Sequence, residues 1–342
     1  MNNELTFDEL ALIAGGHSAF QLLWAGVSLG VFDRLSEQPD MTLSQLAEIL
    51  ELEEQPARIL LSGLATLKLL VKSEDSFRNC DIVEQVFVRS SEGNMVDVLG
   101  WQAHITYPAQ VDFLESLRRN TNVGLRHFPG EGNDLYHRLA YNPGLEQVFH
   151  DAMSSLSRSA NSVLCDQADF TGVNHLVDAG GGNGENAIAL ARANPHLRIT
   201  IFDAPTVCEL AEKNAAEAGL SDRVKTHPGD FFVDDFPDDI DAIIFAHMLT
   251  IWSLPRNTEL LKRCRDALPI GGQLFIFNMM ANDNDVGPVA ATLGSPYFLT
   301  IATGEGMLYS WRDYEKCLAD AGFAQTNRHE LPRNHGLLVG LK

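Results

Sequence analysis

Basic residues are scarce in this sequence. Its 342 residues include 25 lysines and arginines against 46 aspartates and glutamates, which gives a formal net charge of -21. A surface this acidic repels the phosphates of nucleic acids and the anionic headgroups of membranes. We therefore expect neither a nucleic acid nor a membrane among the partners of the protein.

Long apolar runs and paired cysteines are also missing. No stretch approaches the roughly 20 apolar residues that a membrane-spanning helix needs, and the acidic segment "MNNELTFDEL" (1–10) does not resemble a signal peptide. The five cysteines form no C-x-x-C pair, so reduced thiols are favoured over a disulfide framework or a zinc site. These absences predict a cytoplasmic protein without a metal site.

Residues 1–97 have the pattern of a small helical domain. "TLSQLAEIL" (42–50) begins with a capping box, Thr42 with Gln45, and its apolar residues recur on one helical face. A second amphipathic segment, "QPARILLSGLATLKLLV" (55–71), precedes a polar turn between two short β-segments. Helix, turn, helix and hairpin form the outline of a winged helix. Because the second helix has few basic residues, a dimerisation or lid module is favoured over a DNA-binding one.

The pattern changes in the second half of the chain. From residue 174, strand-like runs alternate with helical segments, which is typical of βαβ units in a mostly parallel sheet. We predict a Rossmann-like, doubly wound α/β domain over 166–342, with helices over 98–165 that link the two domains and line an acceptor pocket. The predicted strands are "HLVDA", "LRITIFD", "RVKTHPGD", "DAIIFAHML", "GGQLFIFNMM" and "HGLLVGLK".

A glycine-dense turn follows the first of these strands. It fits D-x-G-x-G-x-G, with Asp178, Gly180, Gly182 and Gly184. A dinucleotide fingerprint would place its third glycine where Glu185 stands, and this carboxylate would repel a pyrophosphate at the helix N-terminus. No G-K-[ST] follows, which excludes a P-loop. The turn therefore predicts a nucleoside ligand that carries no phosphate.

Two further aspartates end the next two strands. Asp203 in "TIFDAP" stands about 20 residues further on, where a carboxylate usually accepts from a ribose diol. Asp230 in "HPGDFF" is placed to accept from an adenine amine, with Phe231 covering the ring. S-adenosylmethionine has a sulfonium cation, an ammonium and a ribose diol, which the three carboxylates complement. The alternative is that the aspartates only cap turns between strands and helices.

These segments together resemble the plant caffeate and acetylserotonin O-methyltransferases and their bacterial natural-product relatives. "LGVFDRL" and the two helical segments after it are similar to the winged-helix dimerisation domain of that family of class I methyltransferases. "VDAGGGNG", "FDAPTV" and "GDFF" resemble its cofactor segments, and "MSSLS" resembles a helix whose serine touches the cofactor. The resemblance implies a homodimer formed through the N-terminal domain, with a small-molecule acceptor bound between the domains. The predicted cofactor-binding residues are Ser157, Asp178, Gly180, Gly182, Asp203, Ala204, Asp230, Phe231 and His247.

The resemblance also implies a catalytic histidine just before a D-W pair, supported by two glutamates. In "FAHMLTIWSLP", Trp252 aligns with the family tryptophan, so Thr250 occupies the histidine position. Asn278 replaces the first glutamate, and the second falls near Leu308. The family's usual way of deprotonating a phenol is therefore missing.

Other side chains are candidates for the missing catalytic base and for contacts with the acceptor. His247, three residues before Thr250, is a replacement base, a cofactor contact or a packed imidazole. A lone helical histidine such as His104 is more often structural, and for Phe149, His150 and Met153, which follow a helical spacing, core packing is favoured over substrate contact. We predict catalytic roles for His247, Thr250 and Asn278, and substrate contacts for Trp101, His104, Phe149, Met153 and Trp252.

The favoured function is methyl transfer from S-adenosylmethionine to a small natural-product or aromatic acceptor. O-transfer is favoured on family grounds, while C- or N-transfer fits a nucleophile that needs no base, because catalysis then rests on positioning and desolvation. A second hypothesis is an enzyme that keeps the cofactor but moves no methyl group. A third is a non-enzymatic regulator or binding module.

Overall fold

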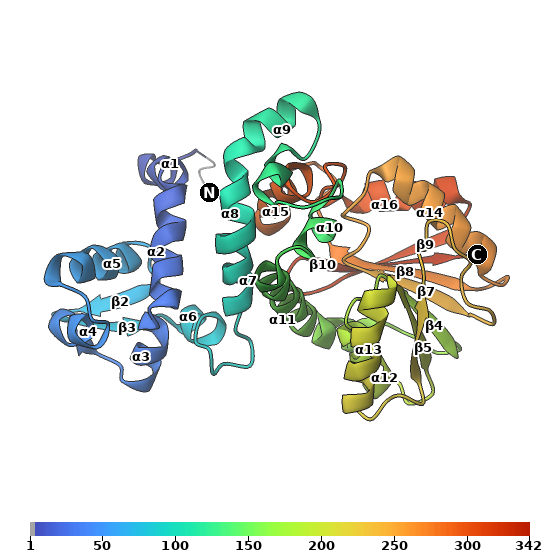
Figure 1. The fold of residues 1–342 in the computed structure, drawn as a ribbon, viewed down its shortest axis with the longest axis horizontal. Coiled ribbons are helices and arrows are strands. Elements are labelled where there is room, and N and C mark those ends of the chain that lie inside the picture. The colour runs from blue at the N-terminus through green and yellow to red at the C-terminus, as the bar shows by residue number, and fades with distance from the viewer. Residues whose placement is uncertain (1–3) are drawn as a thin grey trace. The chain divides into compact units, whose positions relative to one another are not determined.

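The computed structural model describes residues 4–342, which form two compact units (Figure 1). The first unit ends at His104, and the second spans Ile105–Lys342. The helices predicted over 98–165 are divided between the units, since α7 (Val96–Trp101) belongs to the first and α11 (Pro143–Gln167) to the second.

The first unit has the predicted winged-helix outline. A small antiparallel sheet with strand order β1-β3-β2 packs with the helices around one apolar core. The capping box of α4 is confirmed, because Thr42 accepts from the Gln45 backbone and the Gln45 side chain accepts from the Thr42 backbone. The elements are α1 (Phe7–Ala14), α2 (Gly16–Ser28), α3 (Val31–Glu37), β1 (Met41–Thr42), α4 (Leu43–Ile49), α5 (Glu54–Thr66), β2 (Leu70–Ser73), β3 (Ser76–Asn79), α6 (Asp81–Val86) and α7.

Short, irregular helices connect the first unit to the sheet of the second. The helical run predicted near residues 100–119 is interrupted by a π-helical turn at Gln102–Thr106 and by Pro108, which has no N–H to continue a helix. The long helix α11 follows, within the range 98–165 where helices are predicted. The other helices here are α8 (Tyr107–Ala109), α9 (Phe113–Arg119) and α10 (Leu135–Leu139), with 3-10 turns at Gln110–Asp112 and Val123–His127.

A seven-stranded sheet forms the centre of the second unit, with the order β6-β5-β4-β7-β8-β10-β9 (Figure 1). β10 runs antiparallel to both of its neighbours, and the other pairs are parallel. The predicted doubly wound sheet is thus confirmed. Its elements are β4 (His175–Ala179), α12 (Glu185–Ala193), β5 (Arg198–Asp203), α13 (Pro205–Glu217), β6 (Val224–Pro228), β7 (Ala242–Ala246), α14 (Leu254–Ala267), β8 (Gln273–Met279), α15 (Val289–Thr300), α16 (Trp311–Ala321), β9 (Gln325–Glu330) and β10 (His335–Leu341).

The order of the strands locates the functional edge of this sheet. The chain winds outward from β4 through β5 to β6, then returns to place β7 on the other side of β4. Open α/β sheets bind their ligands at such a switch point, outside the carboxyl ends of the strands. All five residues of β4 and of β7 are buried, so these two strands form a rigid base for the loops that follow them.

β9 is not among the six strands predicted above. Its sequence, "QTNRHE", contains no apolar residue, and five of its six residues are exposed at the edge of the sheet. Among residues 4–342 no single helix is long and apolar enough to cross a membrane. α1 and α2 pass that test only as a pair, and a bend of 70° separates them.

Candidate cofactor and active site

The turn between β4 and α12 has the conformation that its glycines predict. Gly180, Gly182 and Gly184 have φ values of +74°, +59° and +87°, a region in which a side chain is strained. The Gly180 N–H donates to the Phe202 carbonyl at 2.8 Å, which ties the turn to the end of β5. A Cβ added to Gly182 would meet no atom within 4 Å, so this glycine borders open space.

Asp178 lies beneath this turn with its carboxylate fully buried. Neither of its oxygens has a hydrogen-bond partner among the described residues. Burial, and secondarily the nearby Asp203 carboxylate, raise the pKa of Asp178 to about 7. Buried acceptors normally have donors, so an orphaned carboxylate indicates a missing ligand with N–H groups or positive charge.

Asp203 ends β5 and is already engaged by the backbone. Its carboxylate accepts from the Gly182 N–H at 2.9 Å and from the Ala204 N–H at 2.7 Å. Burial raises the pKa of Asp203, and these two hydrogen bonds oppose that shift. The side chain is thereby fixed against the glycine turn, and a carboxylate can accept further bonds from a ribose diol.

Asp230 and Phe231 follow β6, and their surroundings differ. Asp230 is exposed and accepts from the Phe232 N–H at 2.9 Å, which is the capping role of the alternative hypothesis. Phe231 is buried, with its ring edge-on to Trp252 at 5.8 Å and to Phe202 at 6.0 Å. Their adenine contacts stay predictions.

The helix α11 runs beside the glycine turn. Asn183 of the turn donates to the Ser154 hydroxyl at 2.8 Å, and Ser157 lies half-buried almost one helical turn further on. At the other end of the helix, the Phe149 ring packs edge-on against Tyr136, and Met153 is half-buried one turn further along the helix. The helix therefore extends from the predicted cofactor site toward the predicted acceptor contacts.

His247 follows β7 in a strained conformation, with φ of +59°. Its ring lies against His335 and Phe277, and its buried Nε2 has no partner of normal hydrogen-bond geometry among the described residues. Burial, together with His335, lowers the pKa of His247 to about 3, although Asn278 opposes the shift. The imidazole is therefore neutral at pH 7 and only weakly basic.

The positions that align with the family's base and its supports contain no titratable group. Thr250 is buried, and its hydroxyl donates to the His247 carbonyl at 3.2 Å. Asn278 is also buried and donates to the Tyr314 hydroxyl at 3.0 Å. Leu308 is half-buried, and its N–H donates to Ser295. None of these three side chains can deprotonate a phenol as the family histidine does.

Two predicted acceptor contacts belong to the first unit. Trp101 lies half-buried at the end of α7, and the exposed His104 ring stands edge-on to Trp24 with 5.3 Å between centroids. Their roles stay predictions.

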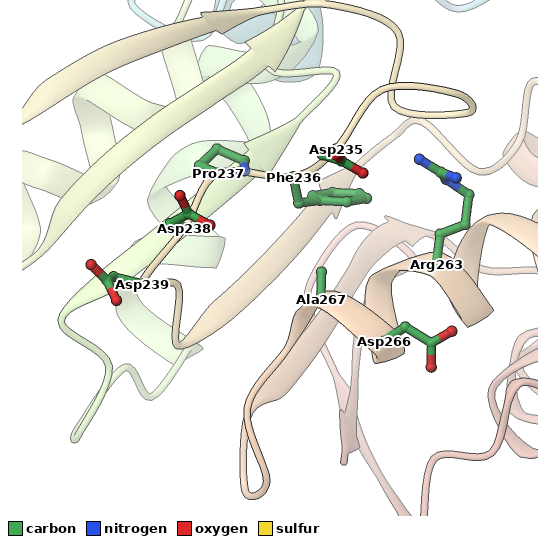
Figure 2. Close-up of a pocket in the computed structure, with 8 residues that line it drawn as sticks. All are labelled: Asp235, Phe236, Pro237, Asp238, Asp239, Arg263, Asp266 and Ala267. Carbon is green, nitrogen blue, oxygen red and sulfur yellow. The ribbon is translucent and has the colours of Figure 1, made fainter.

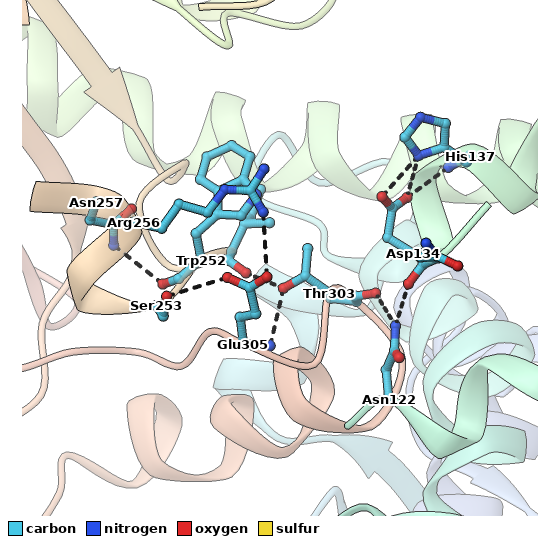
Figure 3. A network of polar contacts seen from close by, with 12 residues as sticks. Asn122, Asp134, His137, Trp252, Ser253, Arg256, Asn257, Thr303 and Glu305 are labelled. Atoms are coloured by element: carbon cyan, nitrogen blue, oxygen red, sulfur yellow. Dashed lines mark hydrogen bonds and ion pairs between the residues drawn. The ribbon is translucent and has the colours of Figure 1, made fainter. Parts of the chain in front are cut away.

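Several side chains near the site were not predicted. The half-buried Tyr136 beside Phe149 interacts with the buried Tyr297, and burial raises the pKa values of both phenols. Glu305 and Arg256 form an ion pair next to Trp252 (Figure 3). Both pairs join positions far apart in the chain, and no short motif signals them.

A cavity of about 470 Å³ is found elsewhere, lined by Asp235, Phe236, Pro237, Asp238, Asp239, Arg263, Asp266 and Ala267 (Figure 2). Asp239 lies just before β7 and Ala267 before β8, so the cavity opens at the amino ends of the strands. The glycine turn stands at the carboxyl ends, and the cavity is thus separate from the predicted cofactor site.

The buried carboxylate under a glycine turn, the acidic residue at the next strand end and the sheet order together define a class I methyltransferase that uses S-adenosylmethionine. The O-methyltransferase domain profile matches residues 117–324, and the O-methyltransferase dimerisation domain profile matches residues 11–88. The chain belongs to this O-methyltransferase family, whose cofactor is S-adenosylmethionine. The predicted fold, enzyme class and cofactor are confirmed.

Similar proteins include methyltransferases of Streptomyces species. The chain is 41% identical over 342 residues to the L-tyrosine C(3)-methyltransferase of Streptomyces lavendulae, covering 99% of this chain and 93% of that one. It is 30% identical over 332 residues to the 3-hydroxy-5-methyl-1-naphthoate 3-O-methyltransferase of Streptomyces sahachiroi, covering 96% and 94%. The apo crystal structure of the S-adenosylmethionine-dependent methyltransferase SibL superimposes with a TM-score of 0.88 at 40% identity, covering 99% of each chain.

Proposed function

We propose that the protein methylates a ring carbon beside the hydroxyl of a small phenol of the tyrosine class. The proposal is supported by the likeness, over nearly the whole chain, to a tyrosine C(3)-methyltransferase. It is supported independently by Thr250, which stands where the family's base belongs and has no basic group.

The glycine-turn residues fit S-adenosylmethionine. We assign the orphaned Asp178 carboxylate to the ammonium group, and Asp203 to the ribose diol. When bound, the cofactor supplies a methyl group on a sulfonium, with S-adenosylhomocysteine as the leaving group. The glycines let the backbone approach the cofactor closely, and the buried strands β4 and β7 form a rigid base beneath the site.

The missing base favours carbon as the accepting atom. A phenol has a pKa near 10, so transferring its proton to His247, with a pKa of about 3, would be uphill by roughly 10 kcal/mol. Transfer to oxygen requires that proton to leave before or during the reaction. Transfer to a ring carbon of the neutral phenol would need no side-chain base, because the proton on the methylated carbon would then be strongly acidic and would leave to water.

Transfer to the phenol oxygen, predicted from the resemblance above, remains the second candidate. The naphthoate O-methyltransferase of the same family supports it. Nothing in the local geometry supplies the base that this reaction uses in the family.

We further infer that the protein acts as a homodimer through its first unit. Large apolar side chains are exposed along α1, among them Phe7 at 82% and Ile13 at 68%. Exposed apolar stripes of this kind indicate an interface, in agreement with the dimerisation domain profile. A cytoplasmic location stays a prediction.

The test is to incubate the full chain with methyl-¹³C-labelled S-adenosylmethionine and L-tyrosine, and to locate the label by NMR. We expect label on the ring carbon beside the hydroxyl, because aryl methyl and aryl methoxy carbons give well-separated signals. A methoxy signal would favour the O-transfer candidate. Consumption of the cofactor without any labelled product would contradict both.

A further inference from the structure

Side chains of the loop over residues 303–309 form hydrogen bonds with the backbone of the segment that carries Trp252 (Figure 3). Thr303 donates from its hydroxyl to the Ile251 carbonyl, and the Tyr309 hydroxyl donates to the Trp252 carbonyl at 2.8 Å. A Cβ on Gly306 would lie 1.9 Å from the Thr250 carbonyl oxygen. The backbone on either side of Trp252 is thus held by another loop, which approaches it as closely as glycine allows.

Glu305 of this loop extends the connection to α14. Its carboxylate accepts from the Ser253 hydroxyl and from Arg256 Nη1, each at 3.3 Å (Figure 3). Ser253 is the N-cap residue of α14, and Arg256 lies in its first turn. One carboxylate therefore fixes both the start of the helix and the direction of the arginine.

Arg256 lies over two aromatic rings. Its guanidinium carbon is 4.4 Å from the centroid of the Phe232 ring and 5.8 Å from that of Trp252. These two rings meet edge-on at 4.8 Å, and both also contact Phe231. Arg256 thereby contacts both the segment that carries Thr250 and Trp252 and the segment after β6 that is predicted to bind adenine.

We propose that Glu305 and Arg256 are positioning residues for the cofactor. Glu305 holds the guanidinium over the Phe232 ring and within 5.8 Å of the Trp252 ring centre, and these contacts fix the turn that carries Asp230 and Phe231. The proposal rests on the predicted adenine role of that turn and does not depend on which acceptor atom is methylated.

The exposure of the pair argues against a role in stability alone. The side chains of Arg256 and Glu305 are 45% and 39% exposed, and ion pairs at such positions contribute little to folding. A planar guanidinium also stacks where an ammonium does not, so Arg256→Lys keeps the charge and removes the stack. The consequence of losing the pair should therefore appear in ligand binding.

The experiment is a calorimetric titration of S-adenosylhomocysteine into the full chain and into the Glu305→Gln, Arg256→Lys and doubly substituted variants. We expect each single substitution to weaken binding by about threefold to tenfold, and the double variant to bind no more weakly than the weaker single one. Glu259→Gln is the matched control, because Glu259 forms an exposed ion pair with Lys262 on the same helix. It should leave the affinity unchanged.

Melting temperatures separate positioning from folding. Both single variants should melt within about 2 °C of the parent chain. Unchanged affinities, fully additive losses, or a large drop in melting temperature would each overturn the proposal. Since no acceptor is present, a failure of the proposed ring methylation leaves this result intact, whereas absence of binding to the parent chain would contradict the cofactor assignment itself.

Discussion

The turn after β4 and the segment after β7 stand at the carboxyl ends of adjacent strands. Burial nevertheless shifts the pKa values of their buried side chains, Asp178 and His247, in opposite directions. Burial raises the pKa of Asp178 to about 7 and lowers that of His247 to about 3. In both cases the apolar surroundings favour the neutral form. A buried carboxylate can still bind a ligand that carries a positive charge. A buried imidazole without a partner, in contrast, loses its capacity as a base. The first region is therefore suited to a positively charged ligand, and we propose that the second does not perform the family's proton transfer.

The largest effect is expected from Asp178→Asn, which removes the charge that distinguishes the first region. Truncating one partner of a buried charge pair costs roughly 3–5 kcal/mol, so affinity for S-adenosylhomocysteine should fall on the order of 100-fold or more. Calorimetric titration measures it. A loss below tenfold would show that Asp178 does not face the ammonium group.

The same variant should stabilise the ligand-free protein at high pH. The folded pKa of Asp178, about 7, lies above its unfolded value of about 3.9, so the ionised carboxylate opposes folding. This penalty is absent below pH ~4 and grows as the pH rises to about 7. Asp178→Asn should therefore raise the melting temperature at pH 8 more than at pH 4, and the reverse order would contradict the assignment.

Gly306→Ala tests the second region through its backbone. The added methyl group would lie 1.9 Å from the Thr250 carbonyl oxygen, and overpacking of this kind costs about 1–3 kcal/mol or more. We expect a lower melting temperature and a fall in kcat of about tenfold or more, because Thr250 and Trp252 must shift. Gly144→Ala is the control, since its Cβ would meet only an ordinary contact at 3.5 Å. Equal behaviour of the two variants would contradict the close approach.

Cofactor affinity should depend on pH through Asp178. Because the ligand favours the ionised carboxylate, affinity should rise by about tenfold between pH 6 and pH 8, with release of a proton. Titrations in two buffers with different ionisation enthalpies count that proton. The dependence should disappear in Asp178→Asn; if it persists there, another group is responsible.

The smallest effect is expected from His247→Asn, which replaces the side chain while tolerating its positive φ. An imidazole with a pKa of about 3 takes no proton at pH 7, so kcat should fall by less than about tenfold. The pH profile should keep its shape. If the pH–rate profile of the variant loses one limb, His247 is the catalytic base.

The sequence predicts most of the structure wherever one local pattern decides it. The buried run of β4, the left-handed glycines after it and the capping box at Thr42 all follow from residue types at short range. β9 escapes prediction because an exposed edge strand needs no apolar residue.

The candidate site is less predictable because long-range contacts determine its chemistry. That Asp203 ends the strand next to β4 follows from strand order, but its hydrogen bond to Gly182 does not. The pKa of His247 depends first on burial that no motif records, and then on His335, 88 positions further along the chain. The Gly306 approach to Thr250 likewise depends on how two loops meet.

The pH dependence of kcat/KM with L-tyrosine as acceptor tests most directly whether the second region lacks a base. The account predicts that the rate rises continuously as the pH approaches the phenol pKa near 10, because only ionisation of the acceptor itself makes the ring more nucleophilic. A plateau reached near pH 7, set by a group with a pKa of about 6.5, would reveal a catalytic base and contradict it.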